Sequence, residues 1–205
     1  MLSHAVRYAI AALVFGACAC SSPDYVPDTG WSDSESEADF YEDWFGKQLA
    51  AAKEPSLSGR DDLGPFVSRF RLLVLPSFAP ASIYRIDETS SGQLKLSYTK
   101  LNGAGGYEPG WVTERWQRGL SPGETITFRK AIELAKLPEA HREGGPNVTL
   151  DDNSKEVMIL CFDGTRFVFE LLSAEQRHFV TRHDCELDRD GELGELIEFV
   201  SGLAL

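Results

Sequence analysis

Residues 82–98 read Ser-Ile-Tyr-Arg-Ile-Asp-Glu-Thr-Ser-Ser-Gly-Gln-Leu-Lys-Leu-Ser-Tyr, and this stretch decides the fold class. Leu94, Leu96 and Tyr98 alternate with polar side chains, which is the period of a strand with one buried face. The turn residues Ser-Ser-Gly separate this strand from the one over residues 82–86. We therefore predict an antiparallel pair, and a further strand over residues 70–75 that ends at Pro76.

Two helices are predicted from capping and periodicity. Ser121-Pro122-Gly123-Glu124 is a capping box with proline at the first helical position, and the segment ends before Pro138. Apolar residues then recur at one-face helical spacing in this segment and again near the end of the sequence, where we expect Asp190 to cap the helix. The two stripes are Phe128, Ala131, Ile132 and Ala135 in the first helix, and Leu193, Leu196, Ile197, Val200 and Leu203 in the second.

A hairpin is predicted over residues 157–172, because Asp163-Gly164 is a favoured two-residue turn. Closing it on that turn opposes Met158 to Phe169 and places both on the core face. A further strand over residues 178–185 follows. The predicted fold is α+β, an antiparallel sheet with two helices packed on one face in the order strands, helix, strands, helix. Residues 60–205 form this single domain.

The first 20 residues differ from the rest of the sequence. An uncharged, mostly apolar run over residues 8–17 follows Arg7, and it is too short to cross a bilayer as a helix but has the length of a secretory signal core. Phe15-Gly16-Ala17-Cys18 resembles the lipobox of bacterial lipoproteins, although that family prefers Leu where this chain has Phe15.

The resemblance implies that residues 1–17 are a signal peptide and that Cys18 carries a diacylglyceryl anchor, which is sufficient for stable membrane attachment. An alternative cut before Cys20 would release a soluble protein. Ala19 after the lipidated cysteine implies, by the same resemblance, sorting to the outer membrane. We therefore expect a lipid-anchored protein of the bacterial cell envelope that faces the periplasm.

Residues 18–59 are predicted to be an acidic, disordered tether, because no Lys or Arg lies between Arg7 and Lys47 and acidic residues are frequent. Four aromatic residues interrupt this composition and either dock on the chain's own domain or bind a partner. These residues are Phe40, Tyr41, Trp44 and Phe45. The net charge of −12 and the lack of a basic cluster exclude nucleic acid as a partner.

Residues 102–110 read Asn-Gly-Ala-Gly-Gly-Tyr-Glu-Pro-Gly, which we interpret as a mobile hairpin loop because no helix follows it to form a phosphate site. This loop, Leu137-Pro138, the Asp163-Gly164 turn and the terminal amphipathic helix resemble a widespread family of uncharacterised bacterial proteins. That resemblance brings no activity with it, and a tryptophan expected before Leu137 is absent.

Cys161 and Cys185 are expected to form a disulfide, because the predicted compartment permits it. Zinc held by these cysteines with His183 and His178 is an alternative, although His178 lies on the opposite face of the strand from His183 and no Cys-x-x-Cys spacing occurs. A calcium loop starting at Glu186 is another, but Ile197 stands where such a loop needs Glu.

No nucleophile-and-base motif, metalloprotease motif or Walker loop occurs in the sequence. The expected function is therefore a non-catalytic envelope lipoprotein without cofactors that binds another protein, for example as an immunity or inhibitor protein for a periplasmic toxin. One alternative is a structural or assembly lipoprotein of an envelope complex. A periplasmic hydrolase whose catalytic set assembles only in space is another.

Overall fold

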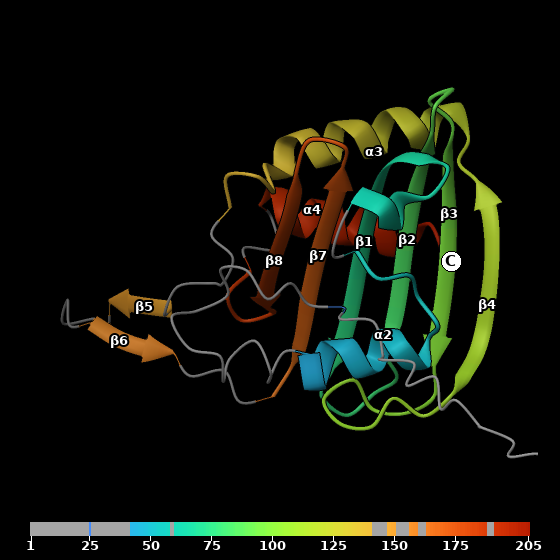
Figure 1. The fold of residues 1–205 in the computed structure, drawn as a ribbon. Helices are drawn as coiled ribbons and strands as arrows, with labels where there is room; N and C mark the ends of the chain where they lie inside the picture. The colour runs from blue at the N-terminus through green and yellow to red at the C-terminus, as the bar shows by residue number, and fades with distance from the viewer. Residues whose placement is uncertain are drawn as a thin grey trace, which may run out of the picture.

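The computed structural model describes Tyr25 and residues 42–57, 60–140, 147–150, 156–159, 163–187 and 191–205. These form a six-stranded antiparallel sheet in the order β4-β3-β2-β1-β7-β8, a separate β5–β6 pair, and helices (Figure 1). The fold is therefore α+β with an antiparallel sheet, as predicted. The elements in chain order are η1 (Glu42–Gly46), α2 (Lys47–Ala51), η2 (Arg60–Leu63), β1 (Phe66–Pro76), β2 (Ser82–Thr89), β3 (Leu94–Leu101), β4 (Val112–Gly119), α3 (Pro122–Ala135), β5 (Asn147–Leu150), β6 (Glu156–Ile159), β7 (Thr165–Ser173), β8 (Arg177–His183) and α4 (Glu192–Gly202).

The predicted β2–β3 pair is confirmed, with Tyr84 opposite Tyr98 and Ile86 opposite Leu96. The central strand is β1, whose Leu72 lies opposite Tyr84 on one side and, on the other side, opposite a residue of β7 nearly 100 positions later in the chain. This long-range pairing brings the two halves of the chain into one sheet.

One face of the sheet packs on α3 and α4, which also contact each other. The even-numbered side chains of β1 to β3 lie on this face because side chains alternate along a strand. Phe70 meets Phe128 of α3 with ring centroids 5.5 Å apart, and Leu196 and Val200 of α4 are fully buried. The predicted stripes of the two helices therefore supply the core of this layer.

The capping box that opens α3 is confirmed. The Ser121 hydroxyl accepts a hydrogen bond from the backbone N–H of Glu124, whose carboxylate in turn accepts from the N–H of Ser121 at 2.7 Å. Hydrogen bonds from Arg118 and from the Ser121 backbone lower the pKa of Glu124 from 4.5 to about 2. For α4, the residue at the cap is Gly191, which makes no side-chain cap, rather than the expected Asp190.

The opposite face of the sheet is covered at one end by η1 and α2 (Figure 1). Phe45 and Leu49 are buried there against Leu73 and Ile83, and Tyr25 belongs to the same cluster. Residues 42–57 were expected to belong to the disordered tether, with docking on the domain as one of two possibilities for its aromatic residues. Residues 42–51 form helical turns, and buried side chains between Phe45 and Leu57 pack on the domain. Burial of a few apolar side chains on the apolar face of the sheet stabilises the docked segment, although its average composition is acidic.

The predicted hairpin over residues 157–172 is wrong. Met158 pairs with Val148 in the β5–β6 ladder, whereas Phe169 pairs with Leu72 and Val180 in the main sheet. Gly164 bonds to the β1–β2 connection instead, with its carbonyl accepting from the N–H of Ser77 at 2.8 Å. The local turn signal was therefore overridden by pairing of β7 with β1 and β8.

Candidate functional site

Trp44 and Phe45, two of the four predicted partner-binding aromatic residues, pack on the chain's own domain. Phe45 is completely buried and lies 6.4 Å from Phe179, measured between ring centroids. Trp44 donates a hydrogen bond from Nε1 to the carbonyl of Gly105 at 2.7 Å. The sequence left two possibilities for these residues, docking on the chain's own domain or binding of a partner, and Trp44 and Phe45 follow the first. Phe40 and Tyr41 lie outside the described residues.

Of the cysteines to which the sequence assigns a role, the structure describes only Cys185. Cys18 and Cys161 lie outside the described residues, so the anchor site and the Cys161–Cys185 disulfide stay predictions. Cys185 follows the end of β8 and its sulfur is not a free thiol.

The turn after β8 brings three possible metal-ligand types together, His183, Asp184 and Cys185, with their ligand atoms within 4.8 Å of one another. His183 Nδ1 lies 2.8 Å from the Asp184 carboxylate and 3.1 Å from the Cys185 sulfur. The other Asp184 oxygen accepts the N–H of Thr165 at 3.0 Å. The three groups thus close the turn with contacts to one another and to β7, and this geometry alone does not define a metal site.

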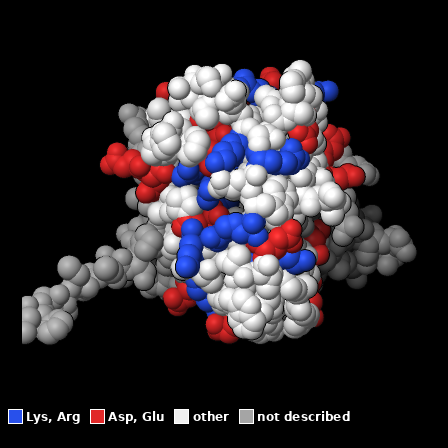
Figure 2. Space-filling model, turned by 90° about the vertical axis from the view of Figure 1, so that its right-hand side faces the viewer, with Lys and Arg blue, Asp and Glu red and all other residues white. Residues whose placement is uncertain are grey.

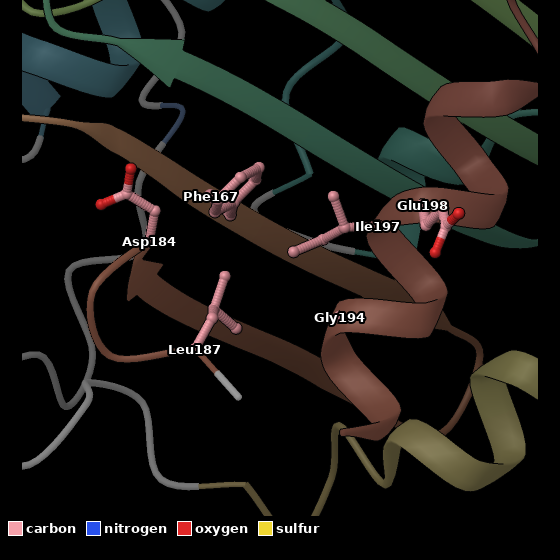
Figure 3. A pocket seen from close by; sticks show the side chains of 6 residues that line it. All are labelled: Phe167, Asp184, Leu187, Gly194, Ile197 and Glu198. Atoms are coloured by element: carbon pink, nitrogen blue, oxygen red, sulfur yellow. The ribbon is translucent and has the colours of Figure 1, made fainter. Parts of the chain in front are cut away.

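A pocket of about 320 Å³ lies beside this turn, between α4 and β7 (Figure 3). Phe167, Leu187 and Ile197 point toward its centre, and Gly194 of α4 leaves room by having no side chain. The carboxylates of the two acidic residues at its ends, Asp184 and Glu198, point away from the centre in Figure 3. Small-molecule sites combine an apolar lining with polar groups that converge on the ligand. This pocket has the first feature and, among the described residues that line it, lacks the second.

A network of buried charges lies on the sheet face that α2 partly covers. Arg71 Nε donates to Glu170 at 2.5 Å, and Arg85 donates to Glu54 at 2.5 Å. Arg71 also donates to the carbonyl of Pro55 at 2.6 Å, which fastens the chain after α2 to the sheet. Because these groups bond to one another and to the chain directly after α2, we assign the network to holding Glu54 and Pro55 against the sheet. Its members are Glu54, Arg69, Arg71, Arg85, Asp87, Glu170 and Arg177.

Three large aromatic side chains are exposed in the two loops next to α2. Phe78, in the β1–β2 loop, is 68 % exposed, and Tyr107 and Trp111, in the β3–β4 loop, are 57 % and 69 % exposed. The rings of Phe78 and Tyr107 stack with centroids 5.9 Å apart, so the two loops touch. We call these three residues the aromatic tip. Sequence reasoning missed it, because the loops are far apart in the chain.

The β3–β4 loop is fixed to its surroundings, although its glycines predict a mobile loop. The side-chain amide of Gln48 donates to the carbonyls of Gly105 and Tyr107 at 3.3 Å and 3.2 Å. A Cβ added to Gly105 would lie 2.8 Å from the backbone of Leu75, so only glycine fits there. Gly105 therefore allows the loop to pack closely against β1.

The outer edge of β4 is the second exposed feature. Within the described part of the chain, β3 is the only strand beside β4. The N–H of Leu120 donates to the carbonyl of Leu94 at 2.9 Å. Since inward and outward groups alternate along an antiparallel strand, the register then directs the backbone groups of Trp116 and Arg118 toward β3. The N–H and C=O groups of Arg115 and Gln117 point to the open edge.

Comparison of the chain with protein-family models finds no match, and comparison with curated proteins finds none either. These comparisons therefore test neither of the two resemblances noted in the sequence. Among the described residues, no helix has the length and apolar character needed to cross a membrane.

Proposed function

We propose that this chain is a lipid-anchored, non-catalytic protein of the bacterial cell envelope that binds another protein along the outer edge of β4. Anchoring at Cys18 rests on the lipobox-like segment at residues 15–18. The observation that carries the binding proposal is the row of outward backbone donors and acceptors on β4. An extended segment of a partner pairs with such an edge as an added strand.

The charge around this edge favours an acidic partner. Arg115 lies on β4, and Lys95 and Lys100 are exposed on β3. Arg118 of β4 is paired with Glu124 at 2.8 Å, and Glu114 is exposed beside Arg115, so the positive charge that is open to a partner comes from Arg115 and the two lysines. Figure 2, which faces the β4 side of the molecule, shows Lys and Arg side chains across the middle of this surface with Asp and Glu side chains beside them, although the whole chain carries a net charge of −12. Complementary charge steers association and selects the partner.

The same charges disfavour pairing between two copies of the chain. Two β4 strands paired with Arg115 opposite Arg115 would place like charges against each other, and like charges directly opposite destabilise a sheet. Charged side chains on an edge strand also prevent unspecific pairing with neutral strands. The proposal therefore commits to an acidic, extended segment of a different protein, and an immunity or assembly role would each use this contact.

The test uses two substitutions at one position. Gln117→Pro removes both the side-chain amide and the outward N–H, whereas Gln117→Ala removes the side chain and keeps the N–H. Proline is tolerated on an edge where its nitrogen faces away from the ladder. Each tagged, lipidated variant is captured from detergent-solubilised envelopes, and the bound proteins are quantified by mass spectrometry together with the N-terminal peptide that carries Cys18.

We expect one stoichiometric partner with the unchanged chain, near-normal recovery with Gln117→Ala, and at least a tenfold loss with Gln117→Pro, since a strand addition depends on main-chain hydrogen bonds. Equal recovery with both variants would refute the β4 interface. An N-terminal peptide without lipid on Cys18 would refute the anchor independently of the partner.

A further inference from the structure

The side chains of the aromatic tip are exposed to solvent although hydrogen bonds fix the loops that carry them. Phe78 and Tyr107 stack on each other in solvent, and the backbone carbonyl of Tyr107 accepts from the buried amide of Gln48. Trp111 is fixed at the base of its loop by two hydrogen bonds to Asn102, one through each backbone group. An ordered, exposed aromatic group of this kind marks a contact surface.

The chain also approaches its predicted anchor at this end of the sheet. Tyr25 is buried in the same cluster as Leu75, Ala81 and Leu101, the residues from which the two tip loops depart. Cys18 lies seven positions before Tyr25, and seven steps along the chain span at most about 25 Å when fully extended. A lipid on Cys18 therefore holds this end of the domain close to the bilayer surface.

The charge of the tip loops suits a lipid surface. The β1–β2 loop over residues 77–81 has no charged residue, and the β3–β4 loop over residues 102–111 has only Glu108. Lys47 of α2 lies 3.4 Å from the Glu108 carboxylate and balances it. This local neutrality contrasts with the acidic chain as a whole, which anionic headgroups would repel.

We infer that Phe78, Tyr107 and Trp111 rest in the headgroup region of the bilayer that carries the anchor, an inference that depends on the lipidation of Cys18 in the proposed function. Tryptophan and tyrosine concentrate at this depth because their rings are apolar at one end and polar at the other. The contact directs the tip end of the strands toward the membrane, and the β4 edge then faces sideways into the aqueous space, where a partner can pair with it.

The test measures the depth of Trp111 in lipidated protein reconstituted into vesicles of phosphatidylethanolamine and phosphatidylglycerol. A fraction of the lipids carries bromine near the top of the acyl chains, which quenches tryptophan fluorescence on contact. Trp111→Phe is compared with Trp116→Phe, because Trp116 lies in β4, five residues after Trp111, and five residues span up to about 17 Å at the rise of a β-strand. Mass spectrometry of the N-terminal peptide verifies the lipid on Cys18.

We expect Trp111→Phe to remove at least about three times as much of the lipid-dependent quenching as Trp116→Phe does, because quenching needs contact with the bromine. Phe78→Ser with Tyr107→Ser should also reduce the quenching of Trp111. Ile126→Ser with Leu134→Ser is the matched control, since these two apolar residues are exposed on α3, and it should have no effect.

Equal losses from the two tryptophan variants, or no quenching of the lipidated protein, would overturn the inference and leave the anchor intact. A photocrosslinker at position 107 that joins a protein rather than lipid in native envelopes would also overturn it. Absence of lipid on Cys18 would instead refute the anchor of the proposed function, and the two failures are therefore distinguishable.

Discussion

Replacing Glu170 by glutamine removes one charge from the buried network that fastens Glu54 and Pro55 to the sheet. The side chains of Arg71 and Glu170 are 0 % and 1 % exposed, and their contact is 2.5 Å long. After the substitution, Arg71 keeps the carbonyl of Pro55 at 2.6 Å and the more distant carboxylate of Glu54 at 3.9 Å. The guanidinium thus loses its closest counter-charge while it stays buried.

Breaking a buried ion pair by removing one partner costs about 3–5 kcal/mol. Because two other acceptors remain near Arg71, we expect the lower end of this range, about 3 kcal/mol for Glu170→Gln. For a domain of this size the melting temperature then falls by about 6–12 °C. The double variant Arg71→Met with Glu170→Met replaces the pair by apolar groups of similar volume and should recover stability to within about 1 kcal/mol of the unchanged chain.

Urea unfolding followed by far-ultraviolet circular dichroism measures these differences. The slope of the free energy of unfolding against urea concentration should be the same for all variants, since the surface exposed on unfolding does not change. A loss below about 1 kcal/mol for Glu170→Gln, or a double variant less stable than the single one, would refute the claim that Arg71 and Glu170 form a buried, energetically coupled ion pair.

Three further predictions concern packing and pH. Phe45→Ala should cost about 3–5 kcal/mol, because it empties a completely buried site, and limited proteolysis should then cut residues 42–57 before the rest of the domain. Gly105→Ala should cost about 1–3 kcal/mol in urea unfolding because its Cβ would meet backbone at 2.8 Å, whereas Gly123→Ala, with nothing within 4 Å, should be neutral or stabilising. The pKa of Glu124 is lowered from 4.5 to about 2, so its stabilisation is complete above pH 4.5 and is lost as the pH falls to 2. Glu124→Gln should therefore destabilise the protein by about 1 kcal/mol at pH 7 and not at pH 2, and a constant difference across that range would contradict the capping role.

Local patterns predicted the elements whose determinants are local. Alternation at Leu94, Leu96 and Tyr98 located β3 and its pairing with β2, because the strands are joined by a short turn. The Ser121 capping box located the start of α3 because both of its hydrogen bonds lie within four residues. Such signals depend on the periods of helices and strands and survive folding when tertiary contacts agree with them.

Features that depend on distant residues were not predictable. Arg71 interrupts an apolar strand, and the carboxylate that allows its burial lies 99 residues away in the chain. The Asp163-Gly164 turn indicated a hairpin with residues 157–162, but β7 pairs with β1 instead. The aromatic residues around Phe45 indicated docking on the chain's own domain as one of two possibilities, but the apolar surface that receives Phe45 exists only when Leu73 and Ile83 come together in the folded sheet.

The candidate sites depend on strand order in the same way. The sequence identifies Tyr107 as a loop residue, but its contact with Phe78 arises because the β1–β2 and β3–β4 loops meet at one end of the sheet. Similarly, Arg115 belongs to an evident strand, but that this strand forms the edge of the sheet follows only from the order of all six strands.

Hydrogen exchange of the β4 amides in the captured complex tests the central claim most directly. The outward N–H groups of Arg115 and Gln117 should exchange at least about tenfold more slowly with the partner bound than in the free protein, while the amides of the other edge strand, β8, should exchange at unchanged rates. Unchanged exchange at Arg115 and Gln117 in a stoichiometric complex would contradict the account, because the partner would then bind without pairing along β4.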